Sequence, residues 1–93
     1  MDKDEARLVA AQQLRRYRER TRAQLLELLD EPDVFLVKGP SGKSYQVSVQ
    51  ALWDREDGGD LRVLVGVDGG GWSTLSPLCE DFIIRPDGSF VGE

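Results

Sequence analysis

The sequence predicts an α+β fold in which a long N-terminal helix packs on an antiparallel sheet of four or five strands in meander order. Two observations support this prediction. Residues 4–30 contain no Gly or Pro and are rich in strong helix formers. Residues 44–68 alternate apolar and polar side chains with the two-residue period of half-buried strands. We therefore expect a single domain over 1–93, with a helix at 4–30 and a β-meander at 33–93.

The predicted helix carries an apolar stripe at three-to-four-residue spacing. Its members are Leu14, Tyr17, Thr21, Leu25 and Leu28, with Leu8 and Ala11 extending the stripe. Pro32 ends the helix, because the residue before a proline disfavours helical dihedrals. A helix of this length reaches about 40 Å, whereas a nine-residue strand reaches about 30 Å. The helix therefore overhangs the sheet, breaks near its middle, or meets a second molecule with its first turns.

The centre of the predicted sheet is a hairpin within residues 44–68. If Trp53 pairs with Leu61, the apolar side chains of both strands fall on one face. The further pairs are then Ala51 with Val63, Val49 with Val65, and Val47 with Val67. The opposite face of the first strand is polar and consists of Ser44, Gln46, Ser48 and Gln50.

Two glycine-containing loops define the flanking hairpins. Residues 34–38 predict a short strand, and a three-residue loop at 40–42 pairs Val37 with Tyr45 and Phe35 with Val47. A two-residue loop is disfavoured, because it opposes two lysines. The run 85–89 contains a similar Pro-x-Gly loop. It predicts a terminal hairpin that pairs Ile84 with Phe90 and Ile83 with Val91.

The remaining segment of the sheet lies between these hairpins. Residues 72–75 predict a fourth strand that ends at Pro77. We expect Trp53 and Trp72 to supply large parts of the core, at about 2–3 kcal/mol each for burial.

The composition excludes most catalytic and metal chemistry. There is no histidine, so the usual general base and imidazole metal ligands are missing. Cys79 is the only cysteine, which excludes an internal disulfide and a cysteine-based zinc site. Carboxylates remain, but nothing in their spacing singles out a catalytic pair. We therefore expect no enzymatic activity, no cofactor and no metal.

Two loops resemble ligand-binding motifs without matching them. The run 39–44, GPSGKS, is similar to the end of the phosphate-binding loop of nucleotide triphosphatases, but Val37 stands where the first glycine belongs and a strand follows in place of a helix. The acidic run 54–60 lacks the calcium-loop pattern, since Gly58 and Val65 occupy ligand positions. Both runs are interpreted as hairpin turns.

Charge divides the chain into two parts. The net charge is −5, of which residues 1–30 contribute +1 and residues 31–93 contribute −6. The helix centre holds a local excess of arginines, namely Arg15, Arg16, Arg18, Arg20 and Arg22. These could form a contact strip for nucleic acid or an acidic partner. The preferred interpretation is a solvated face whose arginines cover apolar surface and pair with acids of the sheet.

The closing run SPLCEDFIIRPDGSFVGE resembles the ending of small bacterial domains of unknown function, and its specific part is DFIIRPDGSFVGE. The resemblance covers about the last third of the chain. It implies a shared β-rich fold and carries no activity across.

The sequence favours a non-catalytic binding or regulatory domain that acts through contacts with another protein. The candidate contact residues are the five arginines together with Gln46, Ser48 and Gln50. Nucleic-acid binding through the arginines is the first alternative, and a carboxylate-dependent enzyme is a disfavoured third. A homodimer through Leu8, Val9 and Leu14 of an overhanging helix is a further hypothesis. With no apolar run long enough to span a membrane and no signal-like N-terminus, we expect a cytoplasmic protein without membrane contacts.

Overall fold

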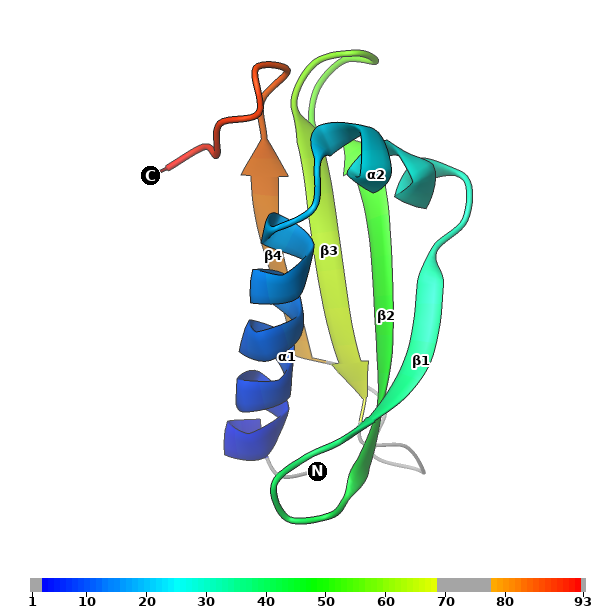
Figure 1. Ribbon diagram of the computed structural model, residues 1–93, viewed down its shortest axis with the longest axis vertical. Coiled ribbons are helices and arrows are strands. Elements are labelled where there is room, and N and C mark those ends of the chain that lie inside the picture. The colour runs from blue at the N-terminus through cyan, green and yellow to red at the C-terminus, as the bar shows by residue number, and fades with distance from the viewer. Residues whose placement is uncertain (1–2, 69–77, 93) are drawn as a thin grey trace.

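In the computed structural model, which describes residues 3–68 and 78–92, helices cover one face of a four-stranded antiparallel sheet (Figure 1). The helical elements are α1 (Lys3–Arg18), α2 (Arg22–Leu26) and the 3₁₀ turn η1 (Glu27–Leu29). The strands are β1 (Asp33–Lys38), β2 (Ser44–Trp53), β3 (Leu61–Asp68) and β4 (Leu78–Ile84), in the sheet order β1-β2-β3-β4. The predicted α+β meander is confirmed.

The predicted strand registers are confirmed as well. Trp53 lies opposite Leu61, and the pairs of valines and alanine that follow from this register all occur between β2 and β3. In the β1–β2 hairpin, Val37 faces Tyr45, and Gly42 has a positive φ of 89° at the end of the three-residue loop. A bridge between Ile84 and Phe90 forms the terminal hairpin. The two-residue period and the loop lengths together set these registers, because a slip by one residue would turn the apolar side chains of β2 to the opposite face.

Of the alternatives left open for the helix predicted over 4–30, a break near its middle is the one that the structure has, after Arg18. The amides of Glu19 and Arg20 donate to carbonyl oxygens three residues back, at 3.3 and 3.1 Å, which tightens the last turn of α1. Thr21 is extended, with φ −70° and ψ 158°, and caps α2 through a reciprocal capping box with Gln24. The break redirects the chain: α1 lies against β3 and β4, whereas η1 lies against β2 (Figure 1).

The buried face of α1 differs from the predicted stripe. It consists of Ala6, Val9, Ala10, Gln13 and Tyr17. Leu8 is 45% exposed and Ala11 is also exposed. The predicted stripe assumed one continuous helix that included Leu25 and Leu28. The break between α1 and α2 rotates these two leucines relative to α1, so the residues that α1 buries are different ones. Those two leucines are buried, but they lie in α2 and η1.

This difference also corrects the predicted helix-mediated dimer. Val9 has no exposed surface, Leu14 is partly buried against the core, and only Leu8 is well exposed. The prediction that Leu8, Val9 and Leu14 together form an exposed dimer interface is therefore wrong.

The core lies between the helices and the inner face of the sheet. The residues without exposed surface on β3 are Leu61, Val63, Val65 and Val67. Trp53 is only partly buried and packs against the edge of this core, so its predicted central role is wrong. Trp72 and the strand predicted over 72–75 lie outside the described residues. The fourth strand that the structure describes is β4, which begins directly after Pro77 and pairs with β3 along its whole length.

Among the described residues, no helix combines the length and the apolar character needed to cross a membrane.

Candidate functional site

The candidate site is the face of the sheet that points away from the helices, which we call the outer face. As predicted, Gln46, Ser48 and Gln50 of β2 alternate with buried residues and are exposed on this face. The registers place Leu36 of β1 beside Gln46, and Leu64 of β3 beside Gln50. The outer face therefore mixes amide and hydroxyl groups with aliphatic side chains.

A shallow depression of about 280 Å³ lies at the centre of the outer face. Its lining residues are Gln46, Ser48, Gln50, Leu64, Gly66, Asp68 and Cys79. Gly66 keeps the depression open, because a Cβ at this position would approach the Ser48 hydroxyl oxygen to 3.0 Å. Side-chain amides and hydroxyls both donate and accept hydrogen bonds, so this lining can bind a polar backbone or side chain without requiring a charge.

Aliphatic side chains lie towards the margins of the outer face. Val34 and Leu36 of β1 are 60% and 73% exposed, and Leu52 near the end of β2 is 41% exposed. Large apolar side chains grouped with polar ones are typical of protein-contact surfaces. The sequence identified the polar half of this surface. It missed the aliphatic half, because the run VFLV in β1 is apolar on both faces and does not show which face lacks a cover.

One ion-pair network crosses the outer face near the tips of β2, β3 and β4. Arg62 of β3 donates to Asp54 through Nε at 3.1 Å and Nη2 at 2.8 Å, and it also pairs with Asp81 of β4. The hydrogen bonds that Arg62 donates, to Asp54 and then to Asp81, raise the pKa of its guanidinium. Both carboxylates are partners of Arg62, so they hold neighbouring strands together. Sequence reasoning missed this network, because Asp54 lies in the β2–β3 loop, Arg62 on β3 and Asp81 on β4.

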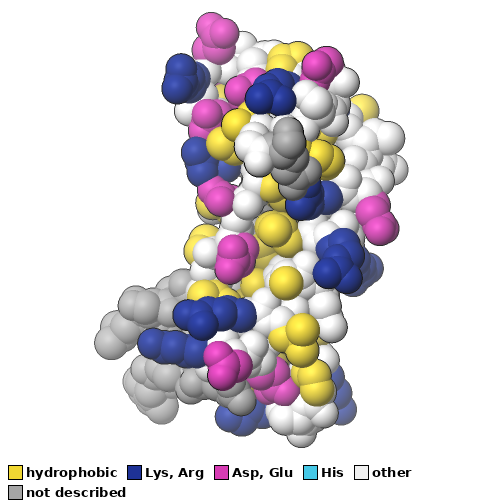
Figure 2. Space-filling model, turned by 90° about the vertical axis from the view of Figure 1, so that its left-hand side faces the viewer, with side chains coloured by type: hydrophobic (Ala, Val, Ile, Leu, Met, Phe, Trp, Pro, Cys, Tyr) yellow, Lys and Arg dark blue, Asp and Glu magenta, His cyan; other side chains and the backbone are white. Residues whose placement is uncertain are grey.

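The arginines predicted as a contact strip are dispersed by the helix break. The Arg18 guanidinium lies 4.5 Å from the centre of the Phe90 ring, and that of Arg20 lies 4.1 Å from the Tyr17 ring. Arg20 also approaches Asp33 at 3.5 Å, and Arg16 donates to Gln13 at 3.2 Å. On the side of the molecule shown in Figure 2, basic side chains are interspersed with acidic ones.

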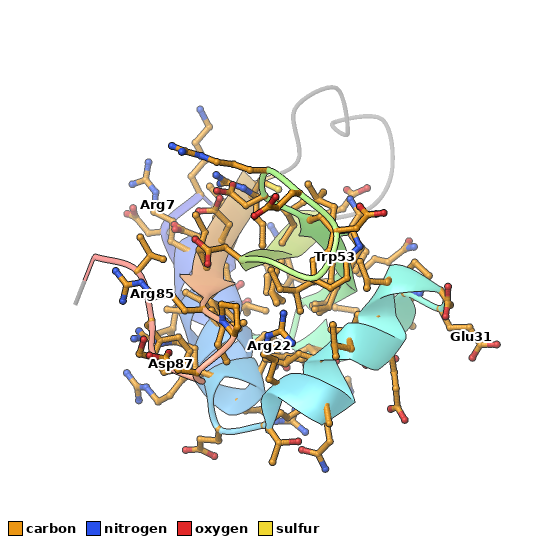
Figure 3. The ribbon with its side chains drawn as sticks, turned by 90° about the horizontal axis from the view of Figure 1, so that it is seen from above. Arg7, Arg22, Glu31, Trp53, Arg85 and Asp87 are labelled. Atoms are coloured by element: carbon orange, nitrogen blue, oxygen red, sulfur yellow. The ribbon has the colours of Figure 1, made fainter. Side chains whose placement is uncertain are left out.

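Arg22 makes the most internal contact of the five arginines. Its Nη2 donates to the Gly59 carbonyl at 2.7 Å, and its guanidinium lies 5.8 Å from the Trp53 ring. Seen from above, its side chain occupies the centre of the molecule, between the helices and the end of the sheet (Figure 3). Arg22 thus attaches α2 to the β2–β3 loop. The interpretation of these arginines as groups that cover apolar surface is supported for Arg18, Arg20 and Arg22, whereas Arg15 is exposed.

The loop that resembles a phosphate-binding motif is a hairpin turn that binds a carboxylate of its own chain. The backbone amide and the hydroxyl of Ser41 both donate to Glu5 at 2.7 Å, and the Tyr45 hydroxyl donates to Glu5 at 2.5 Å. These bonds, with the Tyr45 bond as the largest cause, lower the pKa of Glu5. Gly39 makes room for this carboxylate, because a Cβ there would approach the Glu5 side chain to 2.7 Å. Sequence reasoning missed this contact, which joins the first turn of α1 to the β1–β2 loop.

Two carboxylates, Glu5 and Asp87, have pKa values shifted downwards. The pKa of Asp87 is lowered by hydrogen bonds from Ser89. A general acid needs a raised pKa instead. A second depression, of about 470 Å³, lies between Arg20 and acidic residues near η1, including Asp33. Asp33 accepts a 2.6 Å hydrogen bond from Tyr17, whose pKa is raised to about 12 by burial and then by this bond. Across the described residues, no group of three or more cysteines or carboxylates is placed to hold a metal ion.

Comparison of the chain with protein-family models, with curated proteins and with solved structures finds no match. The site is therefore interpreted from its own geometry.

Proposed function

We propose that this chain is a non-catalytic binding or regulatory domain, and that a protein partner contacts the outer face at Gln46, Ser48 and Gln50. The observation that supports this proposal is the asymmetry of the sheet. Its inner face packs against helices, whereas its outer face presents exposed amides beside exposed aliphatic side chains, with none of the described helices over it (Figure 1). Such a mixed surface can exclude water around aliphatic contacts while its amides bond to a partner.

Nucleic-acid binding through the arginines finds less support. Three of the five guanidinium groups lie against aromatic rings of the same chain, so a phosphate backbone would have to compete with existing contacts. The net charge of −5 also repels a polyanion. This alternative predicts a mobility shift of labelled nucleic acid at about 50 mM salt that weakens steeply as salt is raised.

The remaining parts of the proposal concern chemistry and location. A carboxylate-dependent enzyme is disfavoured, because the shifted carboxylates carry lowered pKa values. We propose that the protein is cytoplasmic, because its single cysteine, Cys79, cannot form the internal disulfides that small proteins of oxidising compartments commonly use. The resemblance of the closing run 81–93 to small bacterial domains of unknown function supports a bacterial origin.

The test is retention of a partner from a lysate of the source cells by immobilised protein. Wild type is compared with Gln46→Arg, which places a long cationic side chain on the outer face, and with Gln12→Arg, the same change at an exposed position of α1. We expect a stoichiometric partner on wild type and on Gln12→Arg, and its loss from Gln46→Arg. Equal retention by all three proteins, or no stoichiometric partner on any folded sample, would contradict the proposal.

A further inference from the structure

Strand β1 lies at the edge of the sheet, and one of its sides has no strand partner among the described residues. The Gly39 amide donates to the Lys43 carbonyl at 2.8 Å. Because bonded and non-bonded pairs alternate along an antiparallel ladder, the backbone groups of Val37 and Phe35 point towards β2. The amide and carbonyl groups of Val34 and Leu36 therefore point away from the sheet, where another strand could bond to them.

Within residues 3–68 and 78–92, the side chains of the same two residues are the most exposed of the large apolar side chains. Val34 is 60% exposed and Leu36 is 73% exposed. Natural edge strands are commonly protected by an inward-pointing charge, a proline or a bulge. In β1 the charges are confined to the two ends, Asp33 and Lys38, and residues 34–37 between them contain no charge, proline or bulge. An open backbone edge combined with exposed aliphatic side chains is the arrangement used when a protein binds an added strand.

The charges flanking β1 indicate which strand would fit this edge. The N-terminal end is acidic, with Asp30 and Glu31 exposed just before the strand, and Glu31 points away from the molecule (Figure 3). The C-terminal end is basic, with Lys38 and Lys43 both exposed. An antiparallel copy of β1 places the acidic end of each chain beside the basic end of the other. A parallel copy would bring like charges together, which is unfavourable.

We infer that β1 pairs antiparallel with β1 of a second copy of this chain, across a two-fold axis perpendicular to the sheet. In this register Val34 lies opposite Leu36 of the second copy, and Lys38 lies beside Glu31 of the second copy. The axis keeps all helices on one side, so the two outer faces become one continuous surface. The contact is isologous, and it is small, so the dimer forms and dissociates with concentration.

The test is the molar mass in sedimentation equilibrium at low- and high-micromolar concentration. We expect wild type to change from the mass of one chain to that of two as concentration rises. Leu36→Pro should remain monomeric, because proline removes an amide that points away from β2 and is tolerated on the outer side of an edge strand. Leu36→Lys provides a second variant if the proline variant does not fold, as judged by circular dichroism. Leu8→Lys, on the exposed side of α1, is the control and should dimerise like wild type.

A charge exchange tests the predicted orientation. Lys38→Glu should weaken dimerisation at low salt by about tenfold, and the double variant Lys38→Glu/Glu31→Lys should restore it. Wild type that stays monomeric at high-micromolar concentration overturns the inference. So does a dimer that persists in both Leu36 variants, or one that Leu8→Lys abolishes. Because these measurements use purified protein alone, their outcome is independent of whether a partner binds the outer face.

Discussion

Glu5 shows how a single side chain connects two distant parts of this chain. It lies in the first turn of α1, where a carboxylate also suits the helix dipole, and it accepts hydrogen bonds from Ser41 and Tyr45. The Ser41 amide is available because the β1–β2 turn leaves it without a strand partner. The turn has the last glycine and the lysine of a phosphate-binding run, yet its Ser41 amide donates to the Glu5 carboxylate.

Replacement of this carboxylate tests its contribution to acid stability. The pKa of Glu5 is lower in the folded chain than its ordinary value of 4.5. Its contribution is therefore complete above pH 4.5 and is lost as pH falls through the folded pKa. We expect Glu5→Gln to lower Tm at neutral pH and to flatten the decline of Tm below pH 4.5. The measurement is a series of thermal melts from neutral to acidic pH. Glu19→Gln, a change at an exposed residue just after α1, should keep the wild-type slope. An unchanged slope in Glu5→Gln would contradict the assignment.

At the scale of elements, the break between α1 and α2 decides how the helices cover the sheet. A straight helix over 4–30 would cross the strands along one line and leave part of the inner face bare. The break at 19–21 lets η1 reach β2 while α1 stays on β3 and β4. No Gly or Pro marks this position. A local signal is nevertheless present, since Thr21 and Gln24 have the spacing of a capping box.

The capping box is expected to stabilise the second helical segment. The Thr21 hydroxyl oxygen accepts from the Gln24 amide at 3.2 Å, and the Gln24 side chain accepts from the Thr21 amide at 3.0 Å. We expect Thr21→Ala to lower the free energy of unfolding by about 1 kcal/mol, measured by urea denaturation. Thr21→Ser keeps the hydroxyl and should cost much less. Equal losses in both variants would show that the cap does not act through its hydroxyl.

For the whole molecule, the sequence predicted the sheet better than its surroundings. The register follows from alternation together with loop length: alternation excludes every pairing of 44–53 with 61–68 that is shifted by an odd number of residues, and the loop at 54–60 sets Trp53 opposite Leu61. The contacts of the arginine side chains could not be predicted. Arg22, for example, donates to a carbonyl 37 residues away, which only folding brings close to it. The polar half of the outer face follows from the same alternation. Its aliphatic half, at Val34 and Leu36, depends on the helices covering the other side, which no local pattern records.

The two faces of β3 provide a direct measure of this one-sided architecture. Leu61 has no exposed surface and lies on the inner face, whereas Leu64 is partly exposed on the outer face of the same strand. Leu→Ala changes strand propensity similarly at both positions, so the difference between the variants reports burial. We expect Leu61→Ala to cost about 2–5 kcal/mol, a large share of the roughly 5–15 kcal/mol that holds a small domain together. Leu64→Ala should cost less, about 1–2 kcal/mol, because part of the Leu64 side chain stays in contact with water in the folded chain. Urea denaturation of the two variants measures both values. Similar losses would mean that the outer face is packed as tightly as the core, which would leave no open face for a partner to bind.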